Sequence, residues 1–304
     1  MGRVLLIANP AAARTQPGAV QAVVGVLHAA GWHAEVAATG GPGDARRLAA
    51  EGVKDGVDVV AVFGGDGTTM QAATALVGTE VALGLIPGGT GNLLAGNLRL
   101  PPQPVRAAAA ITRGRRRRID LGRVQRADGP HYFAVAAGAG YDARVMVETP
   151  SEHKRQWGML AYVATTFRLL HELRSGPWHI TVDGREYDAN ASLVLVANCA
   201  EVIPPLVKFR STVRPDDGIL DVIVLRADNL GESVRAVWDL LREAEGGERR
   251  GRGAAFVGFA RGREVTVESF PPQPMQFDGD GAGETPFTAT VVPGAVEVYV
   301  LEGA

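Results

Sequence analysis

The sequence predicts a Rossmann-like α/β domain followed by a mainly β, sandwich-like domain. Continuous apolar stretches alternate with amphipathic stretches over the first 120 residues, a pattern typical of a parallel sheet covered by helices on both faces. Beyond this point, shorter strand-like runs are separated by Gly, Pro and Asp turns. The 304 residues suffice for two domains of about 100–200 residues each. We place these domains at residues 1–122 and 123–304.

In the first domain we expect four strands, at residues 4–8, 34–37, 57–63 and 81–86. Each of the first three strands is followed by a helical pattern, and these patterns cover residues 20–27, 45–51 and 68–77. Asp44 stands directly before the second helix, so we expect its side chain to cap that helix.

In the second domain we expect strands at residues 123–125, 132–136, 179–182, 192–197, 220–225, 264–269 and 296–301. Helical patterns at residues 160–170 and 234–241 interrupt this series. The charged, glycine-rich stretch at residues 246–253 is typical of a loop.

The composition excludes several classes of protein. The 31 basic and 33 acidic side chains leave a net charge of −2, which argues against a nucleic-acid partner, because duplex binding needs uncompensated Lys and Arg. The single cysteine, Cys199, excludes a disulfide framework and a multi-cysteine metal site. No stretch reaches the roughly 18 apolar residues of a membrane span. We therefore expect a cytoplasmic protein that meets membranes only at their surface.

Two glycine-rich turns follow neighbouring predicted strands, and each leads toward a helix. The first reads GGDG at residues 64–67, and the second reads PGGTGN at residues 87–92. The carboxyl edge of an open α/β sheet is where ligands bind, and glycine-rich backbone N–H groups attract phosphate. Neither turn is a Walker A loop or a dinucleotide fingerprint. Together they predict phosphate binding, with two ordinary tight connections as the alternative.

These turns resemble motifs of the diacylglycerol kinase catalytic domain superfamily, which includes sphingosine and ceramide kinases and bacterial lipid kinases. GGDGT at residues 64–68 matches its signature, and the turn at residues 87–92 resembles its second motif. The resemblance covers nearly the whole chain through short motifs at residues 9–10, 39, 43–45, 119–122, 138–142, 216–221 and 278–280. GGDGT is shared with NAD kinases and, more loosely, with phosphofructokinases. The later motifs therefore distinguish the diacylglycerol kinase superfamily from these two families.

The resemblance implies a two-domain lipid kinase with a phosphofructokinase-like first domain and an active site in the interdomain cleft. Its substrates would be ATP and the hydroxyl of a diacylglycerol-like or sphingoid-like lipid, with Mg²⁺ as cofactor. The implied nucleotide-binding residues are Asn9, Thr39, Gly64, Gly65, Asp66, Gly67, Thr68, Gly88, Gly89, Thr90 and Asn92. Asp66 would also hold Mg²⁺ or its waters. In the alternative interpretation Asp66 only satisfies local N–H groups of its turn.

Asp278 occupies the position of the family's proton acceptor, the first acidic residue of a D-G-E triplet. Here the triplet is D-G-D, so Asp280 replaces the expected glutamate, and Glu284 is a nearby longer carboxylate. We predict Asp278 and Asp280 as catalytic residues, with an ordinary Asp-Gly hairpin turn as the alternative.

The segment at residues 214–221 resembles one that holds a structural Mg²⁺ in several bacterial members. Asp217 and Asp221 are the candidate ligands, with Asp142 as a further one; a solvated acidic turn is the alternative. Four arginines at residues 115–118 could contact anionic lipid headgroups or form a solvated turn. Lys154, Arg155 and Trp157 form a second candidate for such contact, unless Trp157 packs in a core.

Two other functions stay open. One is a kinase of a soluble acceptor such as NAD, on the same nucleotide site. The other is a catalytically silent nucleotide- or lipid-sensing module, for which Asp280 is the one hint. Zinc-hydrolase and nucleophile-elbow motifs are missing from the sequence. The identity of the lipid is not encoded in any motif, and a homodimer is compatible with the sequence.

Overall fold

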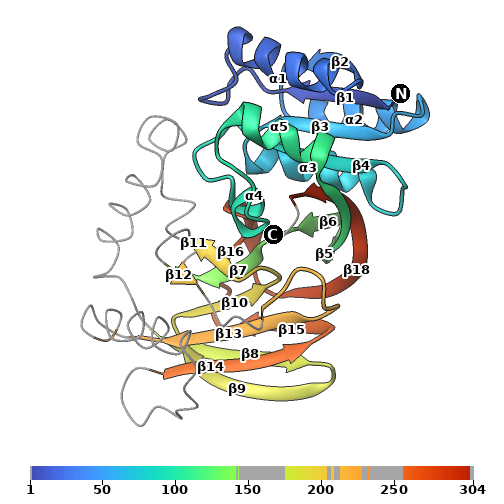
Figure 1. Cartoon of the computed structure of the whole chain (residues 1–304). Coiled ribbons are helices and arrows are strands. Elements are labelled where there is room, and N and C mark those ends of the chain that lie inside the picture. The colour runs from blue at the N-terminus through green and yellow to red at the C-terminus, as the bar shows by residue number, and fades with distance from the viewer. Residues whose placement is uncertain are drawn as a thin grey trace. The chain divides into compact units, whose positions relative to one another are not determined.

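The computed structural model (Figure 1) describes residues 2–141, 143, 175–203, 207–208, 213–227, 232 and 256–301. The chain divides into two compact units, one of Met1–Ile119 with Gly294–Ala304 and one of Asp120–Pro293. The predicted helices at residues 160–170 and 234–241 and the glycine-rich stretch at residues 246–253 lie outside the described residues. So do the candidates Asp142, Lys154, Arg155 and Trp157.

A parallel sheet forms the centre of the first unit. Its first strands are β1 (Arg3–Ala8), β2 (His33–Ala38), β3 (Val59–Gly64) and β4 (Ala82–Pro87). They lie in the order β2-β1-β3-β4 and pair in parallel. Every residue of β3 and β4 is buried, because a continuous run of aliphatic side chains suits a strand covered on both faces. The predicted α/β class is confirmed.

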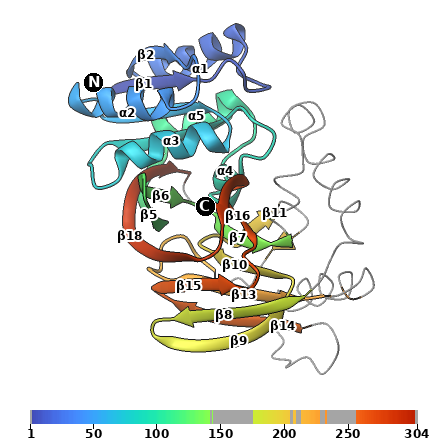
Figure 2. The ribbon, with the colours of Figure 1, turned by 180° about the vertical axis from the view of Figure 1, so that it is seen from behind.

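The helices of the first unit cover both faces of this sheet (Figures 1 and 2). They are α1 (Pro17–Ala29), α2 (Asp44–Lys54), α3 (Asp66–Leu76), α4 (Leu93–Asn97) and α5 (Pro104–Arg113). Helices α1 and α5 pack together on one face, and α2 and α3 pack together on the other. The core between the sheet and the α1–α5 layer includes Leu6, Leu27, Phe63 and Ile111.

The predicted cap of α2 is wrong. Gly43, with a φ of 86°, takes the N-cap position, and Asp44 is the first helical residue. Its Oδ2 accepts hydrogen bonds from the N–H groups of Gly40 and Gly41, at 2.7 and 3.0 Å. Asp44 therefore orders the loop before the helix, and the Gly40 N–H group is the main reason that the pKa of its carboxyl is lowered.

The end of the chain adds a further strand to the first unit. Strand β18 (Phe287–Val300) begins in the second unit and ends in the first, where Val298 pairs in parallel with Leu83 of β4. The last residues of the chain, which we had placed in the second domain, are therefore part of the first unit.

The four arginines at residues 115–118 do not form a turn. They begin strand β5 (Arg115–Arg126), which pairs with β18, and two of their side chains contact residues of the first unit. The Arg116 guanidinium lies 5.6 Å from the centre of the Tyr299 ring and 3.3 Å from the Glu297 carboxylate. Arg118 lies 3.3 Å from both Glu80 and Glu297.

Antiparallel strands make up the second unit and confirm its sandwich-like class. These strands are β6 (Gly129–Phe133), β7 (Ala136–Gly140), β8 (Gly176–Val182), β9 (Arg185–Ala191), β10 (Leu193–Ala197), β13 (Leu220–Arg226), β14 (Phe256–Gly262), β15 (Glu264–Ser269), β16 (Pro274–Phe277) and β17 (Asp280–Glu284). One sheet has the order β14-β13-β10-β7-β16-β17. Strands β15, β8, β9, β5 and β6 belong with β18 to the sheet that also contains β1 to β4. A short pair, β11 (Glu201–Ile203) and β12 (Val207–Lys208), stands apart.

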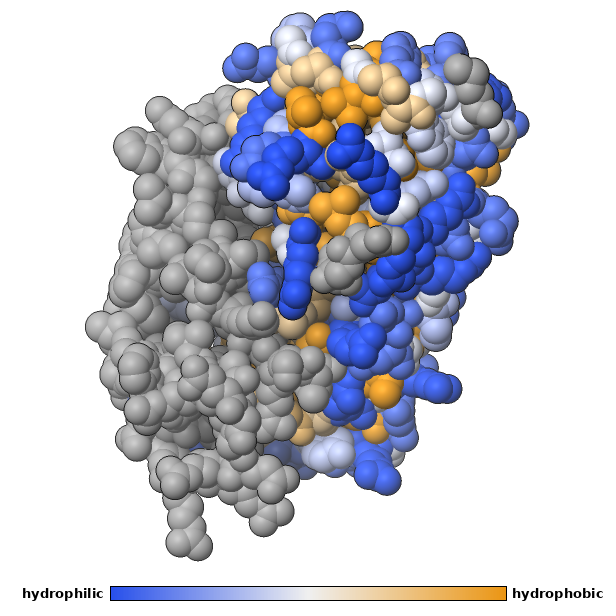
Figure 3. Space-filling model, viewed as in Figure 1, coloured by the Kyte–Doolittle hydropathy of each residue, from blue (hydrophilic) through white to orange (hydrophobic). Residues whose placement is uncertain are grey.

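Side chains from both sheets form one core in this unit. Trp178 and Val267 come from one sheet, and Val194 and Val222 come from the other. On the face shown in Figure 3, hydrophilic side chains cover most of the described surface, with hydrophobic side chains in smaller groups. The apolar residues of the described chain are thus gathered mainly in the cores of the two units.

Candidate functional site

The two glycine-rich turns lie against each other at the carboxyl ends of β3 and β4. The N–H groups of Gly88 and Gly89 both donate to the carbonyl oxygen of Gly64, at 2.8 and 3.2 Å. A Cβ atom on Gly89 would lie 2.8 Å from the Cα atom of Gly65, and one on Gly88 would lie 3.1 Å from that of Gly64. Backbone-to-backbone contact therefore explains why glycine occupies these positions.

Asp66 ties the first turn to the residues after the second. Its Oδ1 accepts a hydrogen bond of 2.6 Å from the N–H of Leu93, the first residue of α4. A Cβ atom on Gly91 would lie 2.7 Å from Asp66 Oδ2, so glycine is also required opposite the carboxylate. Burial raises the pKa of the Asp66 carboxyl, although the N–H groups of Leu93 and Asn92 lower it in part.

Asn92 closes the second turn on itself. Its φ of 51° lies in the left-handed region, which asparagine tolerates better than most residues. The side chain is bonded to Gly89 twice, accepting from its N–H at 3.0 Å and donating to its carbonyl at 2.7 Å. Thr90 and Gly67, both predicted to contact the nucleotide, are exposed on the two turns.

The end of β1 brings a third group to the turns. The side-chain amide of Asn9 donates to the hydroxyl of Thr68 at 2.8 Å, and its backbone N–H donates to the carbonyl of Phe63 at 2.9 Å. Thr39 follows β2 and is bonded through its N–H to the carbonyl of Ala8, at 2.9 Å. The predicted nucleotide-binding residues thus gather along the carboxyl edge of four neighbouring strands.

The structure adds two residues that the motifs did not indicate. The backbone N–H of Arg14 donates to the carbonyl of Gly88 at 3.0 Å, so an exposed arginine lies on the loop that contacts the second turn. Thr15 is buried, and its hydroxyl lies 2.8 Å from where a Cβ atom on Gly88 would be. The signal for both was a loop directly after the first strand, on the edge where ligands bind.

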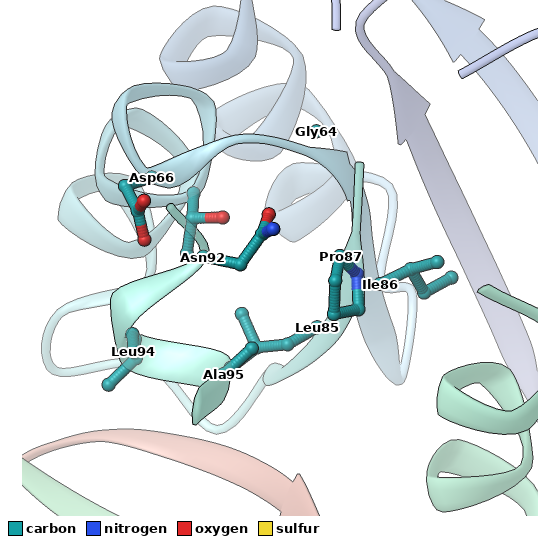
Figure 4. A pocket seen from close by; sticks show the side chains of 9 residues that line it. Gly64, Asp66, Leu85, Ile86, Pro87, Asn92, Leu94 and Ala95 are labelled. Atoms are coloured by element: carbon teal, nitrogen blue, oxygen red, sulfur yellow. The ribbon is translucent and has the colours of Figure 1, made fainter. Parts of the chain in front are cut away.

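A small pocket lies between the turns (Figure 4). Asp66 and Pro87 lie on opposite sides of it, with Asn92 between them. The lining residues are Gly64, Asp66, Thr69, Leu85, Ile86, Pro87, Asn92, Leu94 and Ala95. The pocket itself is narrow, about 10 Å³, which is room for roughly one water molecule. A nucleotide would therefore have to bind beyond this pocket, along the turns.

The residues at the turns fit a magnesium ion that is shared with phosphates. Asp66 provides a carboxylate at the rim of the pocket. The described residues contain no group of three or more His, Cys, Asp or Glu side chains that could hold a metal by themselves. Mg²⁺ in phosphate-transfer sites is commonly bound by one or two carboxylates, with phosphates and water as its other ligands.

In the second unit, Asp278 stands in a two-residue hairpin turn between β16 and β17. Asp278 and Gly279 both have positive φ, 47° and 91°, and Phe277 pairs with Asp280 across the turn. This backbone matches the type I′ turn that Asp-Gly favours. Asp280 and Glu284, on β17, are exposed.

The Asp278 carboxylate binds three successive backbone N–H groups. Its oxygens accept from Ala134 at 2.7 Å, Val135 at 2.8 Å and Ala136 at 2.9 Å. Ala134 and Val135 form the bend between β6 and β7, and Ala136 begins β7, so the single strand predicted at residues 132–136 is wrong. At this bend, three backbone N–H groups therefore donate to the Asp278 carboxylate and not to a neighbouring strand.

The predicted metal ligands Asp217 and Asp221 face an arginine. Arg261 Nη2 lies 2.6 Å from Asp217 Oδ2, and Arg261 Nε lies 2.9 Å from Asp221 Oδ1. These two carboxylates therefore already contact a cation, and as they stand the described residues do not fit a divalent ion.

Two further observations concern the cysteine and membranes. Cys199 is fully buried, and its thiol donates to the carbonyl of Ala134 at 3.2 Å. Within the described part of the chain, we find no helix with the length and apolar character that a membrane crossing requires.

Comparison with known families divides the chain in two. Residues 3–124 match the diacylglycerol kinase catalytic domain, and residues 135–300 match the YegS C-terminal NAD kinase beta sandwich-like domain. A curated "probable lipid kinase YegS-like" protein of Xanthomonas campestris is 32% identical over 275 residues, which cover 86% of this chain and 84% of that one. The diacylglycerol kinase of Mycobacterium tuberculosis is 32% identical over 260 residues, covering 84% and 81%.

Solved structures show the same architecture. A crystal structure of a provisionally assigned diacylglycerol kinase from Bacillus anthracis superposes with a TM-score of 0.81 at 26% identity. The alignment covers 99% of this chain and 95% of that one.

Proposed function

Because the chain belongs to the lipid kinase family built on the diacylglycerol kinase catalytic domain, we propose that it transfers the γ-phosphate of ATP to a lipid hydroxyl. The acceptor is a diacylglycerol-like or sphingoid-like lipid. The main support within the structure is the pair of glycine turns, joined through Gly64 and bridged by Asp66. A lipid acceptor also requires contact with a membrane surface, so we propose peripheral binding there.

The first unit supplies what a polyphosphate needs. Glycine turns at the ends of β3 and β4 let a ligand approach the backbone closely. The N-terminus of α3, an eleven-residue helix that begins at Asp66, attracts negative charge. Arg14 is anchored through its backbone to Gly88 and adds a positive side chain. Asn9 holds Thr68 in place at the same edge.

Asp66 is the residue that we propose to hold magnesium together with the ATP phosphates. When bound, the metal supplies positive charge to the phosphate oxygens, where charge develops during transfer. The bond from Leu93 N–H fixes one carboxylate oxygen of Asp66, and Gly91 leaves room beside the other.

We propose Asp278 as the proton acceptor. In the reaction, the lipid hydroxyl oxygen attacks the γ-phosphorus, its proton passes to the Asp278 carboxylate, and ADP leaves with the former bridging oxygen. The three N–H groups of the β6–β7 bend hold the carboxylate in one orientation, which is the positioning that proton transfer needs.

Labelled ATP and a panel of acceptors test the proposal. The panel contains diacylglycerol, sphingosine and ceramide in detergent micelles, with NAD as the soluble acceptor. Label in the organic phase is the expected result. Label only in a soluble product would replace the lipid with a soluble acceptor, and nucleotide binding without any product would identify a silent module.

A further inference from the structure

The acidic turn before β13 is held at several points within the second unit. Asp120, which is buried, accepts from the N–H of Gly218 at 2.6 Å and donates its own N–H to the carbonyl of Pro215 at 2.6 Å. Asp216 pairs with Arg214 at 3.0 Å. The carboxylate of Asp217 in this turn and that of Asp221, the second residue of β13, share Arg261.

The contact of Arg261 with both carboxylates follows from strand register. Asp221 of β13 pairs directly with Arg261 of β14 across the sheet. The guanidinium uses Nε for Asp221 and Nη2 for Asp217, so its fork joins a residue of β13 to a residue of the preceding turn. Asp217 is further fixed because its Oδ1 accepts from the N–H of Ile219 at 3.2 Å.

The charges favour this arrangement. The Asp217 and Asp221 carboxylates lie 2.6 and 2.9 Å from the Arg261 guanidinium, so each charge is offset by an opposite charge at short range. Asp221 is 6% exposed, and a buried carboxylate that loses its cation becomes strongly destabilising. A divalent ion on the same oxygens would have to displace the guanidinium, because like charges repel at these distances.

We propose that Arg261 is the resident cation of this turn, so that the second unit needs no divalent metal at Asp217 and Asp221. The guanidinium performs the neutralisation that a bound metal would otherwise supply. This inference holds whether or not the chain is a lipid kinase.

Thermal unfolding in the absence of nucleotide tests the proposal. The wild-type midpoint should be the same in EDTA and in about 10 mM CaCl₂. Arg261→Gln should lower the midpoint by about 5 °C, because Asp221 then lies buried without this cation. Calcium should restore about half of that loss, since the two carboxylates can then take a metal. Calcium-dependent stability of the wild type, or no calcium response in the variant, overturns the proposal.

Matched variants separate charge from general damage. Arg263→Gln removes an exposed arginine just beyond the end of β14 and should change neither the midpoint nor the calcium response. Asp221→Asn should lower the midpoint of the wild type but raise that of Arg261→Gln, because it then removes an uncompensated charge. If Arg261→Gln alone does not fold, recovery of a folded protein in the double variant gives the same answer. Failure of the double variant to exceed the single one contradicts the proposal.

Discussion

Two Asp-Gly hairpins in the second unit have nearly the same local structure. Asp183 and Gly184, between β8 and β9, have φ values of 48° and 79°, much like Asp278 and Gly279. Each aspartate carboxylate accepts from backbone N–H groups of a neighbouring segment. Asp183 Oδ1 binds the N–H groups of Arg263 and Glu264, both at 2.9 Å.

The two hairpins differ only in degree. Asp183 is exposed and binds two N–H groups, and Asp278 is half-buried and binds three, but the turn type, the binding of backbone amides and the sequence Asp-Gly are shared. A carboxylate bound to backbone amides is therefore compatible with a structural role, and the family resemblance alone singles out Asp278 as catalytic. Paired substitutions that change one proposed site residue and one scaffold residue of the same kind are the way to separate the two roles.

The largest effect is expected at Asp278. Asp278→Asn keeps a residue that tolerates positive φ but removes the proton acceptor, so kcat should fall by about 10²- to 10⁴-fold. Asp183→Asn is the matched change at the other hairpin and should leave kcat within about twofold. Turnover with saturating ATP and lipid measures both. Equal activities of the two variants would reduce Asp278 to a hairpin residue.

The second comparison concerns two glycines of the first unit. Gly89→Ala would place a Cβ atom 2.8 Å from the Gly65 backbone, which cannot give way as a flexible side chain could, so the turns must separate. We expect kcat/KM for ATP to fall about 100-fold. Gly96→Ala, in α4, meets no atom within 4 Å and should leave ATP kinetics unchanged. Normal ATP kinetics in Gly89→Ala would show that the joined turns do not bind the nucleotide.

The parallel sheet could be predicted because its strands are uninterrupted aliphatic runs whose burial decides their structure. Strands β9 and β17 read REYDANA and DGAGE, and such polar or glycine-rich segments become strands only through their neighbours. The strand predicted at residues 132–136 is broken by a carboxylate more than 140 residues later. Propensity within a window carries no information about such a contact.

The candidate site likewise has one part that the sequence predicts and one part that it does not. Turns that follow neighbouring parallel strands must meet at one sheet edge, so the proximity of the two glycine-rich turns could be predicted from the sequence. The bond from Leu93 to Asp66 and the pairing of Arg261 with Asp221 depend on loop path and strand register. No local motif encodes either contact. Acidic residues in a motif thus predict a negative charge at that position, but the hydrogen-bond donor or cation that the carboxylate contacts is known only from the structure.

A third comparison uses Asp66 and Asp44, the first residues of two eleven-residue helices. Burial raises the pKa of Asp66, whereas the Gly40 N–H group lowers that of Asp44. The stability linked to Asp66 is present below the unfolded carboxyl pKa of about 3.9 and is lost as pH rises through its folded value. Asp44 contributes stability above that pKa, and this is lost as pH falls through its own folded value.

Substitution of these two aspartates by asparagine should therefore shift the unfolding midpoint at pH 7 in opposite directions. Asp66→Asn should keep or raise the unfolding midpoint at pH 7, by up to about 3 °C, while activity at fixed Mg²⁺ falls about 10- to 100-fold. Asp44→Asn should lower the midpoint slightly and leave activity unchanged. Thermal unfolding from pH 3 to 8 and a Mg²⁺ titration of turnover measure these effects. Unchanged turnover of Asp66→Asn across the titration would remove Asp66 from metal binding.

The smallest expected effect is at Arg14, which is exposed and attached to the second turn only through its backbone. The Arg14 Nη1 donates to the carbonyl of Pro102 at 3.1 Å. If the side chain also meets the nucleotide phosphates, Arg14→Ala should raise KM for ATP about 5- to 10-fold and leave kcat nearly unchanged, since an exposed cation contributes about 1 kcal/mol. Arg46→Ala, an exposed arginine on α2, is the matched control and should not change KM. The difference between the two variants should shrink as salt screens the charge. An equal KM in both variants would mean that the backbone of this loop, and not its cation, serves the site.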